Sequence, residues 1–365
     1  MKFTCDRKLF FEKLNNIQRT VSSKSVLPVL EGILLKAYNG KLSLCSYDLE
    51  IGTTSDMEAN IISEGEVVLK AKLLVDVINK LPNDNVYVST DDKLVTEIKC
   101  GNVKYQLTGI SSVEFPDLPT YQEKNKIVMK ASLLQDMIKK VRYAISDNIQ
   151  KPVYTGALFD ISEKTLSLVA VDGFRMAIRK EYVNVNEDMK FIVPGKTLSE
   201  VLKFSVNDDD NIEIIVGQRH VTFLINGYYL VSRLLDGVFI DYNSSIPDTA
   251  STSFVVNKNT FTECIERMAL LNFDKLVSPV TCVINNDGIN FSSITSVGSA
   301  DESLDIMVSG EPLTIGFNNR YLLDALRNCD TDKIKMDFNG ARKPLKIMPL
   351  DGDSFLFIVL PMRLS

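Results

Sequence analysis

The sequence predicts an α+β protein built from three tandem copies of one module, each with two helices packed on β-sheets. Three observations predict this fold. Segments recur at a fixed spacing, each copy mixes helical and alternating patterns, and 365 residues are enough for several domains. The composition, with 45% hydrophobic and 24% charged residues, is ordinary for a globular protein.

The repeat is clearest between the first two copies. Three segments return 124 residues later: Leu27–Gly32 as Lys151–Gly156, Leu42–Asp48 as Leu166–Asp172, and Phe115–Asp117 as Phe239–Asp241. A third copy follows in looser register, with Pro279-Val280 matching Pro152-Val153. We expect boundaries near Asn125 and Pro247, in polar stretches, which gives modules at 1–124, 125–247 and 248–365.

Each copy contains both kinds of periodicity. Apolar residues at helical spacing predict helices over Asp6–Thr20, Leu133–Val141, Lys72–Leu81, Lys196–Phe204 and Arg320–Asn328. Other segments alternate at period two or are β-branched, which predicts strands such as Val86–Val88, Ile212–Val216 and Val221–Ile225.

A cation stands at the start of the second helix of every copy, at Lys72, Lys196 and Arg320. The partial positive charge of a helix N-terminus makes a cation there unfavourable by about 0.3–1 kcal/mol. A solvated polar face would explain one such residue. Recurrence at 124-residue spacing, in a chain of net charge −6, instead favours a surface that faces an external anion without binding it by bulk electrostatics.

The sequence contains no pattern of residues that indicates catalysis. Six scattered cysteines without a C-x-x-C pair indicate free core thiols, and the single His220 indicates a structural residue. No phosphate-binding, dinucleotide, metalloprotease or nucleophile-elbow motif occurs. Asp172-Gly173 and Asp236-Gly237 could suggest a two-carboxylate hydrolase, but their context is that of turns. We expect no enzyme activity, cofactor or metal.

The sequence gives no sign of membrane insertion or export. No apolar run approaches the roughly 20 residues of a membrane helix, and Asp6 interrupts the start, where a signal peptide would be apolar. We expect a cytoplasmic protein.

Two motifs add a family resemblance. The C-terminal segment Val359–Ser365 and the central segment Val171–Ala177, together with the threefold repeat, resemble the bacterial DNA polymerase III beta subunit family, the sliding clamps, over the whole chain. The resemblance implies a head-to-tail homodimeric ring with helices lining the hole. Such a ring would encircle double-stranded DNA independently of its sequence. It would tether the replicative polymerase, the clamp loader, ligase and repair proteins.

The resemblance also implies a hydrophobic cleft that accepts partner peptides, between the second and third copies. The matching positions are Tyr154, Val171, Gly173, Phe174, Arg175, Met176, Ile240, Leu276, Asn318, Tyr321, Arg342, Pro344, Leu360, Pro361, Met362 and Arg363. The chain departs from the family pattern at four positions: Phe174 replaces a His, Ile240 a Pro, Ser244 an Arg and Leu360 a Met. Peptide preference is therefore expected to differ in detail.

Two further surfaces follow from the same resemblance. The DNA-facing positions would be Lys24, Lys72, Arg142, Gln150, Lys151 and Lys196. At the dimer interface, Tyr105 and Leu107 would face Leu270 and Leu271, although all four could equally be ordinary core residues. The alternative to a clamp is a repeat-built scaffold that binds proteins but not DNA, which would leave the three helix-start cations unexplained.

Overall fold

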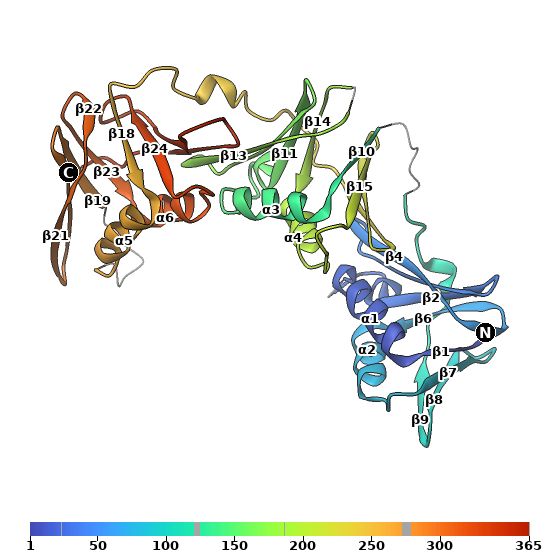
Figure 1. Cartoon of the computed structure of the whole chain (residues 1–365). Coiled ribbons are helices and arrows are strands. Elements are labelled where there is room, and N and C mark those ends of the chain that lie inside the picture. The colour runs from blue at the N-terminus through green and yellow to red at the C-terminus, as the bar shows by residue number, and fades with distance from the viewer. Residues whose placement is uncertain (23, 120–124, 186, 272–278, 365) are drawn as a thin grey trace. The chain divides into compact units, whose positions relative to one another are not determined.

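The computed structural model describes residues 1–365 except 23, 120–124, 186, 272–278 and 365 (Figure 1). Within these residues, each copy holds two α-helices: α1 (Arg7–Ile17), α2 (Ala71–Lys80), α3 (Ala131–Arg142), α4 (Gly195–Val201), α5 (Lys258–Ala269) and α6 (Asn319–Arg327). All five helices expected from the sequence are confirmed. Two of them are shorter than expected. The last turn predicted for α1, Gln18–Thr20, is a 3₁₀-helix, and α4 ends early because the Lys203 N–H bonds back three residues, to the Glu200 carbonyl.

The strands of each copy follow the same order. The first copy contains β1 (Lys2–Asp6), β2 (Gly32–Tyr38), β3 (Lys41–Tyr47), β4 (Ile51–Glu58), β5 (Asn60–Ser63), β6 (Gly65–Lys70), β7 (Asn85–Thr90), β8 (Val95–Cys100) and β9 (Val103–Thr108). The second contains β10 (Lys126–Lys130), β11 (Gly156–Ser162), β12 (Thr165–Val171), β13 (Arg175–Tyr182), β14 (Met189–Pro194), β15 (Asn211–Val216), β16 (His220–Ile225) and β17 (Tyr228–Arg233).

The third copy contains β18 (Thr252–Asn257), β19 (Pro279–Asn285), β20 (Gly288–Thr295), β21 (Gly298–Asp305), β22 (Val308–Gly310), β23 (Leu313–Asn318), β24 (Lys333–Phe338), β25 (Leu345–Pro349) and β26 (Phe355–Val359). In the first and third copies the two helices lie side by side against the sheets (Figure 1). Their buried faces, such as Phe10, Leu14 and Ile17 of α1, supply the apolar contact.

Neighbouring copies share continuous sheets. One eight-stranded sheet has the order β10-β15-β16-β17-β4-β3-β2-β6, and one nine-stranded sheet the order β14-β11-β12-β13-β26-β25-β24-β18-β22. The junctions are β17–β4, where Val231 lies opposite Gly52, and β26–β13, where Ile358 lies opposite Met176. Met176 follows Gly52 by 124 residues, so the two junctions have the same register.

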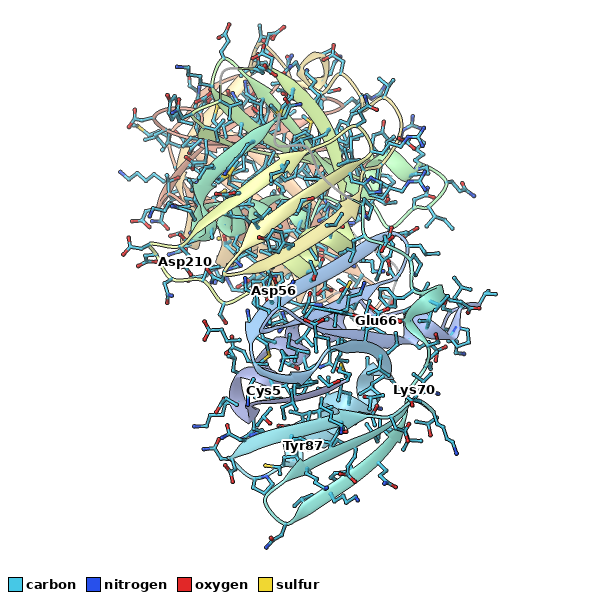
Figure 2. All side chains as sticks on the ribbon, turned by 90° about the vertical axis from the view of Figure 1, so that its right-hand side faces the viewer. Cys5, Asp56, Glu66, Lys70, Tyr87 and Asp210 are labelled. Atoms are coloured by element: carbon cyan, nitrogen blue, oxygen red, sulfur yellow. The ribbon has the colours of Figure 1, made fainter. Side chains whose placement is uncertain are left out.

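The two remaining sheets end in unpaired strands. The sheet β5-β1-β7-β8-β9 ends at β9, and the sheet β21-β20-β19-β23 ends at β21. Figure 2 looks onto the first of these sheets, which carries the labelled Tyr87. In the repeat, β9 corresponds to β17 and β21 corresponds to β13. The strands β17 and β13 each form a junction between two copies, whereas β9 and β21 are the unpaired edges of their sheets.

Each copy ends in a short crossing segment that bonds to the strand before its second helix, which is β6, β14 or β23. The N–H groups of Ile110, Leu235 and Met362 donate to the carbonyls of Val68, Ile192 and Gly316, at 2.8, 3.0 and 2.8 Å. The acceptors are spaced by 124 residues. We call these three segments the straps. The first two straps lead into the next copy, and the third is the C-terminal tail.

Compactness divides the chain differently from the repeat. One compact unit comprises Met1–Leu134 and Lys196–Leu234, and the other comprises Gln135–Gly195 and Leu235–Ser365. The division between the two units falls within the second copy, because one half of that copy belongs to the eight-stranded sheet and the other half to the nine-stranded sheet. The boundaries near Asn125 and Pro247 therefore stay predictions of the repeat, and residues 120–124 of the first boundary stretch lie outside the described part.

The cysteines are all buried and free, as expected. Among the described residues, none of the helices has the length and hydropathy needed to span a lipid bilayer.

Candidate functional site

The central motif forms a tight turn between β12 and β13. The Asp172 carboxylate accepts the backbone N–H groups of Phe174 and Arg175 at 2.8 and 3.0 Å. Gly173 has a φ of +95°, which only glycine adopts readily, and a Cβ there would meet nothing within 4 Å. The turn thus holds Phe174 outward, with 57% of its surface exposed, and Arg175 inward.

Arg175 is buried and fully engaged. Its guanidinium donates to Asp172 at 2.8 Å, to Asp324 of α6 at 2.5 Å and to the Tyr143 carbonyl at 2.6 Å. It also lies against the rings of Tyr143 and Tyr321, at 5.1 and 4.5 Å from their centroids. Burial would lower the pKa of Arg175, but the hydrogen bonds to Asp324 and Asp172 outweigh burial, and the pKa lies above its ordinary value.

The outer surface of this cluster is aromatic. Phe174 stacks on Tyr321 with ring centroids 5.8 Å apart and planes 23° apart. The Asn318 side chain caps α6, the helix that carries Tyr321, by accepting the Arg320 N–H at 3.0 Å. Arg175 is therefore buried beneath half-buried Tyr321, on which exposed Phe174 stacks.

An apolar floor lies next to the turn. Met176 belongs to a buried cluster with Leu158, Ile178 and Ile358, and partly buried Val171 and Phe239 pack against it. Tyr154 contacts the Phe239 ring edge-to-face at 5.6 Å. This cluster includes residues from both the second and the third copies and lies wholly within one compact unit.

The C-terminal tail runs beside these groups. The Leu360 N–H donates to the Phe174 carbonyl at 2.9 Å, and the Met362 N–H donates to Gly316 of β23 at 2.8 Å. Leu364 lies directly over Gly316, where an added Cβ would be 2.5 Å from the leucine Cδ2. Pro361, Met362 and Arg363 then line a cavity of about 560 Å³ together with Arg342 and part of β23.

The remaining predicted cleft positions are placed less closely. Ile240 is 40% exposed, beside Phe239. Pro344 precedes Leu345, which pairs with Val359 just before Leu360. Ser244, at a position where an Arg is common, donates its hydroxyl to the Asp241 carbonyl at 2.8 Å. Leu276 lies outside the described residues.

The predicted DNA-facing residues fall on helix ends and the loops beside them. Lys72, Lys196 and Arg320 are each the second residue of their helix, α2, α4 and α6. Arg142 ends α3, and Lys24, Gln150 and Lys151 lie in exposed loops that follow α1 and α3. In the part of the chain that the structure describes, Lys24, Lys72 and Arg142 form no ion pair.

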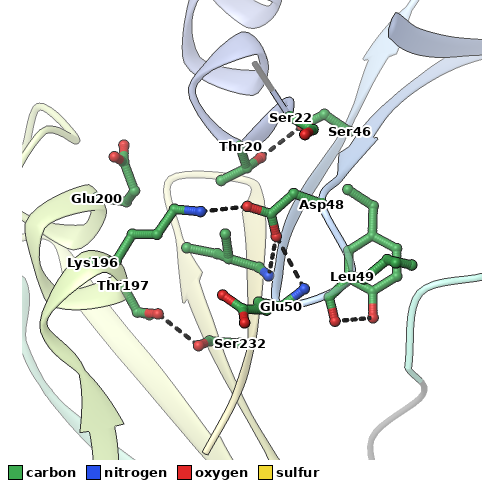
Figure 3. A network of polar contacts seen from close by, with 12 residues as sticks. Thr20, Ser22, Ser46, Asp48, Leu49, Glu50, Lys196, Thr197, Glu200 and Ser232 are labelled. Atoms are coloured by element: carbon green, nitrogen blue, oxygen red, sulfur yellow. Dashed lines mark hydrogen bonds and ion pairs between the residues drawn. The ribbon is translucent and has the colours of Figure 1, made fainter. Parts of the chain in front are cut away.

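Lys196 differs from the other predicted cations, because its ammonium bonds to the Asp48 carboxylate (Figure 3). Asp48 accepts the N–H groups of Glu50 and Ile51 at 3.0 and 2.8 Å, as Asp172 does in the second copy. Nearby, Thr197 and Ser232 share a hydrogen bond of 2.6 Å. The first junction thus carries a polar network where the second carries the aromatic cluster around Arg175.

The predicted dimer residues are partly exposed. Tyr105 of β9 is 39% exposed and Leu270 is 70% exposed, whereas Leu107 is buried within its own sheet and Leu271 is half-buried. Leu271 approaches Gly298 at the start of β21, at 3.9 Å from a Cβ built there. Leu107 therefore combines a core role with a place on an open strand.

Sequence reasoning missed the partners of Arg175. Asp324 had a signal, because Asp76, Glu200 and Asp324 recur at 124-residue spacing, one helical turn after the recurring cations. No sequence signal indicated the contribution of Gly316, because its backbone hydrogen bond to Met362 joins two segments that are far apart in the sequence.

Comparisons with known proteins agree over the whole chain. Family models for the N-terminal, central and C-terminal domains of the DNA polymerase III beta subunit match residues 1–119, 128–241 and 243–363. The beta sliding clamp of Halalkalibacterium halodurans is 30% identical over 380 residues, covering all of both chains. That of Staphylococcus aureus is 31% identical over 374 residues, covering 100% of this chain and 99% of the relative.

Solved structures give the same result. The sliding clamp of Bacillus subtilis superposes with a TM-score of 0.97 at 28% identity, covering all of both chains. A sliding clamp from Pseudomonas aeruginosa bound to griselimycin superposes with a TM-score of 0.93 at 25% identity, again over both whole chains.

The cluster around Arg175 generates a stability prediction. Replacing Arg175 by Met leaves Asp172 and Asp324 without their buried cation, and we expect a loss of about 3–5 kcal/mol in the free energy of unfolding. Arg175→Lys should recover only part of it, because an ammonium cannot make the same planar set of bonds. Denaturant unfolding measures both. Arg342→Met, on an exposed arginine, is the control, and an equal loss there would contradict the prediction.

Proposed function

The chain belongs to the DNA polymerase III beta subunit family, the beta sliding clamps, and on that premise we propose which of its surfaces face DNA, bind peptides and join a second copy. It is a non-catalytic processivity factor, which encircles duplex DNA as a homodimeric ring and tethers the replicative polymerase. We place it in the cytoplasm, where a bacterial polymerase finds its template. The observation that carries the ring is the pair of open strands, β9 of the first copy and β21 of the third, in a chain whose internal junctions are closed.

DNA is held by enclosure rather than by adhesion. A chain of net charge −6 repels phosphates on average, so weak local contacts suffice and sliding stays possible. We propose that Lys24, Lys72, Arg142, Gln150 and Lys151 supply these contacts. Lys196 contributes less, because its charge is already paired with Asp48.

The peptide cleft is proposed at the Phe174–Tyr321 stack, the floor around Met176 and the tail from Leu360 to Arg363. Support comes from exposed rings and aliphatic side chains next to a rigid buried base, which suits apolar anchors of a short peptide. The griselimycin-bound relative shows that a clamp of this fold also takes a small ligand.

The internal junctions predict the register of the dimer junction. We propose that the open strands β9 and β21 of two copies pair in the same register as β17–β4 and β26–β13. Leu107 would then lie opposite Gly298 of the second copy, Tyr105 opposite Ala300 and Lys104 opposite Asp301. Small residues thus face the two large side chains, and opposite charges meet. Leu271, beside Gly298, would then contact Leu107, in agreement with the interface that the resemblance implies.

A second contact follows from the same mapping. At both internal junctions the region of the turn before β4 or β13 meets a helix of the next copy, through Asp48–Lys196 at the start of α4 and Arg175–Asp324 in the middle of α6. The equivalent turn of the third copy, around Val297, would meet the start of α2. There a pocket of about 530 Å³ lies open, lined by Lys72 and exposed Leu73 among others.

Topological retention tests the function. We expect the protein, once loaded by its clamp loader on a closed circular plasmid, to co-elute with the plasmid in gel filtration. Linearising the plasmid should release it, because an enclosing ring slides off an end. Equal retention on circular and linear DNA would indicate ordinary adhesion and contradict the ring.

A charge swap tests the dimer register. Lys104→Asp places like charges opposite each other at both interfaces of the ring. At roughly 1 kcal/mol for each, this should raise the dimer dissociation constant about 30-fold. Adding Asp301→Lys should restore the dimer, as measured by analytical ultracentrifugation at low salt. Lys99→Asp, on the neighbouring β8, is the matched control, and failure of the double variant to recover would overturn the register.

A further inference from the structure

The three turns that precede β4, β13 and β21 differ in length. The strand pairs Tyr47–Gly52 and Val171–Met176 close the first two turns, which therefore comprise residues 48–51 and 172–175. The pair Thr295–Gly298 closes the third turn, which comprises only residues 296–297. The turn of the third copy is thus two residues shorter than its equivalents, and in the proposed dimer it is the turn that faces the second copy.

Each of the two longer turns makes a charged contact with the next copy. Asp48 begins the first turn, and its carboxylate bonds to the Lys196 ammonium of α4. Arg175 ends the second turn, and its guanidinium bonds to the Asp324 carboxylate of α6. Both internal junctions therefore contain an ion pair between a turn and a helix.

The third turn contains no ionisable side chain. A hydroxyl holds it instead of a carboxylate, because Thr295 Oγ1 accepts the Val297 N–H and donates to the Gly298 carbonyl, both at 3.3 Å. Ser296 and Val297 are exposed, Val297 at 62% of its surface. The turn can thus offer a second copy a hydroxyl and an aliphatic side chain, but no charge.

The helix that this turn would meet, α2, carries the charges that are paired at the internal junctions. Lys72 corresponds to Lys196 and Asp76 to Asp324, at spacings of 124 and 248 residues. Lys72 and Asp76 are exposed and line the pocket of about 530 Å³. Neither forms an ion pair within the residues that the structure describes. The charges of α2 therefore lack only the contribution of a turn.

We propose that the short turn withholds a carboxylate from Lys72 and thereby limits the strength of the junction between two copies. The inference rests on the proposed register of the dimer. A carboxylate beside a lysine at a helix N-terminus is favourable, so a turn of the longer kind would stabilise the dimer. Its absence makes the junction easier to open and leaves the charge of Lys72 available to phosphates.

A turn graft tests this inference. Ser296 and Val297 are replaced by Asp-Leu-Gln-Ile or by Asn-Leu-Gln-Ile, two turns of the length of Asp48–Ile51 that differ in one charge. Each junction should contribute about a threefold change, and a dimeric ring has two. The aspartate graft should therefore lower the dimer dissociation constant about tenfold relative to the asparagine graft. Sedimentation equilibrium of the full-length protein at low salt measures both constants.

A point variant keeps the length of the turn, in case a graft does not fold. Val297→Asp places the carboxylate on the exposed side chain of the existing turn. It should lower the dissociation constant several-fold relative to Val297→Asn, and the difference should shrink as salt rises.

Lys72 should account for the whole gain. Lys72→Gln, added to the aspartate graft, should return the dissociation constant to that of the asparagine graft. Lys80→Gln, at the exposed C-terminal end of the same helix, is the matched control and should preserve the gain.

The outcomes separate this inference from the dimer register. Equal dissociation constants for the aspartate and asparagine versions, or a gain that survives Lys72→Gln, would overturn the inference. A tenfold weaker dimer on Lys72→Gln in the otherwise unmodified protein would overturn it too, because Lys72 would then already have a partner across the junction. If the exchange of Lys104 and Asp301 restores the dimer, the register stands without this inference; if the exchange also fails, the register is wrong.

Discussion

The molecule depends on how its sheet edges are paired. A strand at the edge of a sheet exposes N–H and C=O groups that attract another strand. In this chain β4 is covered by β17, and β13 by β26, so two of three equivalent edges are closed internally. The third pair consists of β9 of the first copy and β21 of the third. In the dimer that we propose, a second copy closes it, and the resulting enclosure allows an anionic protein to stay on DNA.

Most of the local structure could be predicted from the sequence, because helical spacing and the 124-residue repeat are local signals. The helices from α1 to α6 begin within a residue or two of the expected positions wherever an expectation was made. The sharing of sheets between copies could not be predicted. Period-two alternation shows that a segment is a strand but does not identify its neighbour, and the partner of β13 lies about 180 residues away.

The candidate site shows the same division. Tyr321, Phe174, Met362 and their neighbours lie in one compact unit, and their role as a peptide cleft stays a prediction of the family resemblance. Arg175 is the instructive exception, since its pattern position indicates a ligand contact whereas its buried guanidinium joins Asp172 to Asp324. The number of lysines in the sequence does not show how many free cations the surface carries, for a related reason. Lys196 looks like a free cation in the sequence, and only the fold reveals that Asp48 neutralises it.

The third strap has a consequence for resistance to inhibitors. The first two straps, at Ile110 and Leu235, lead into the next copy, whereas the last one, at Met362, also lines a cavity beside β23, where we propose the peptide cleft. A substitution in the tail that weakened an inhibitor bound in the proposed cleft would also disturb the covering of β23. We therefore expect few escape routes through the tail, and a fitness defect in those that arise.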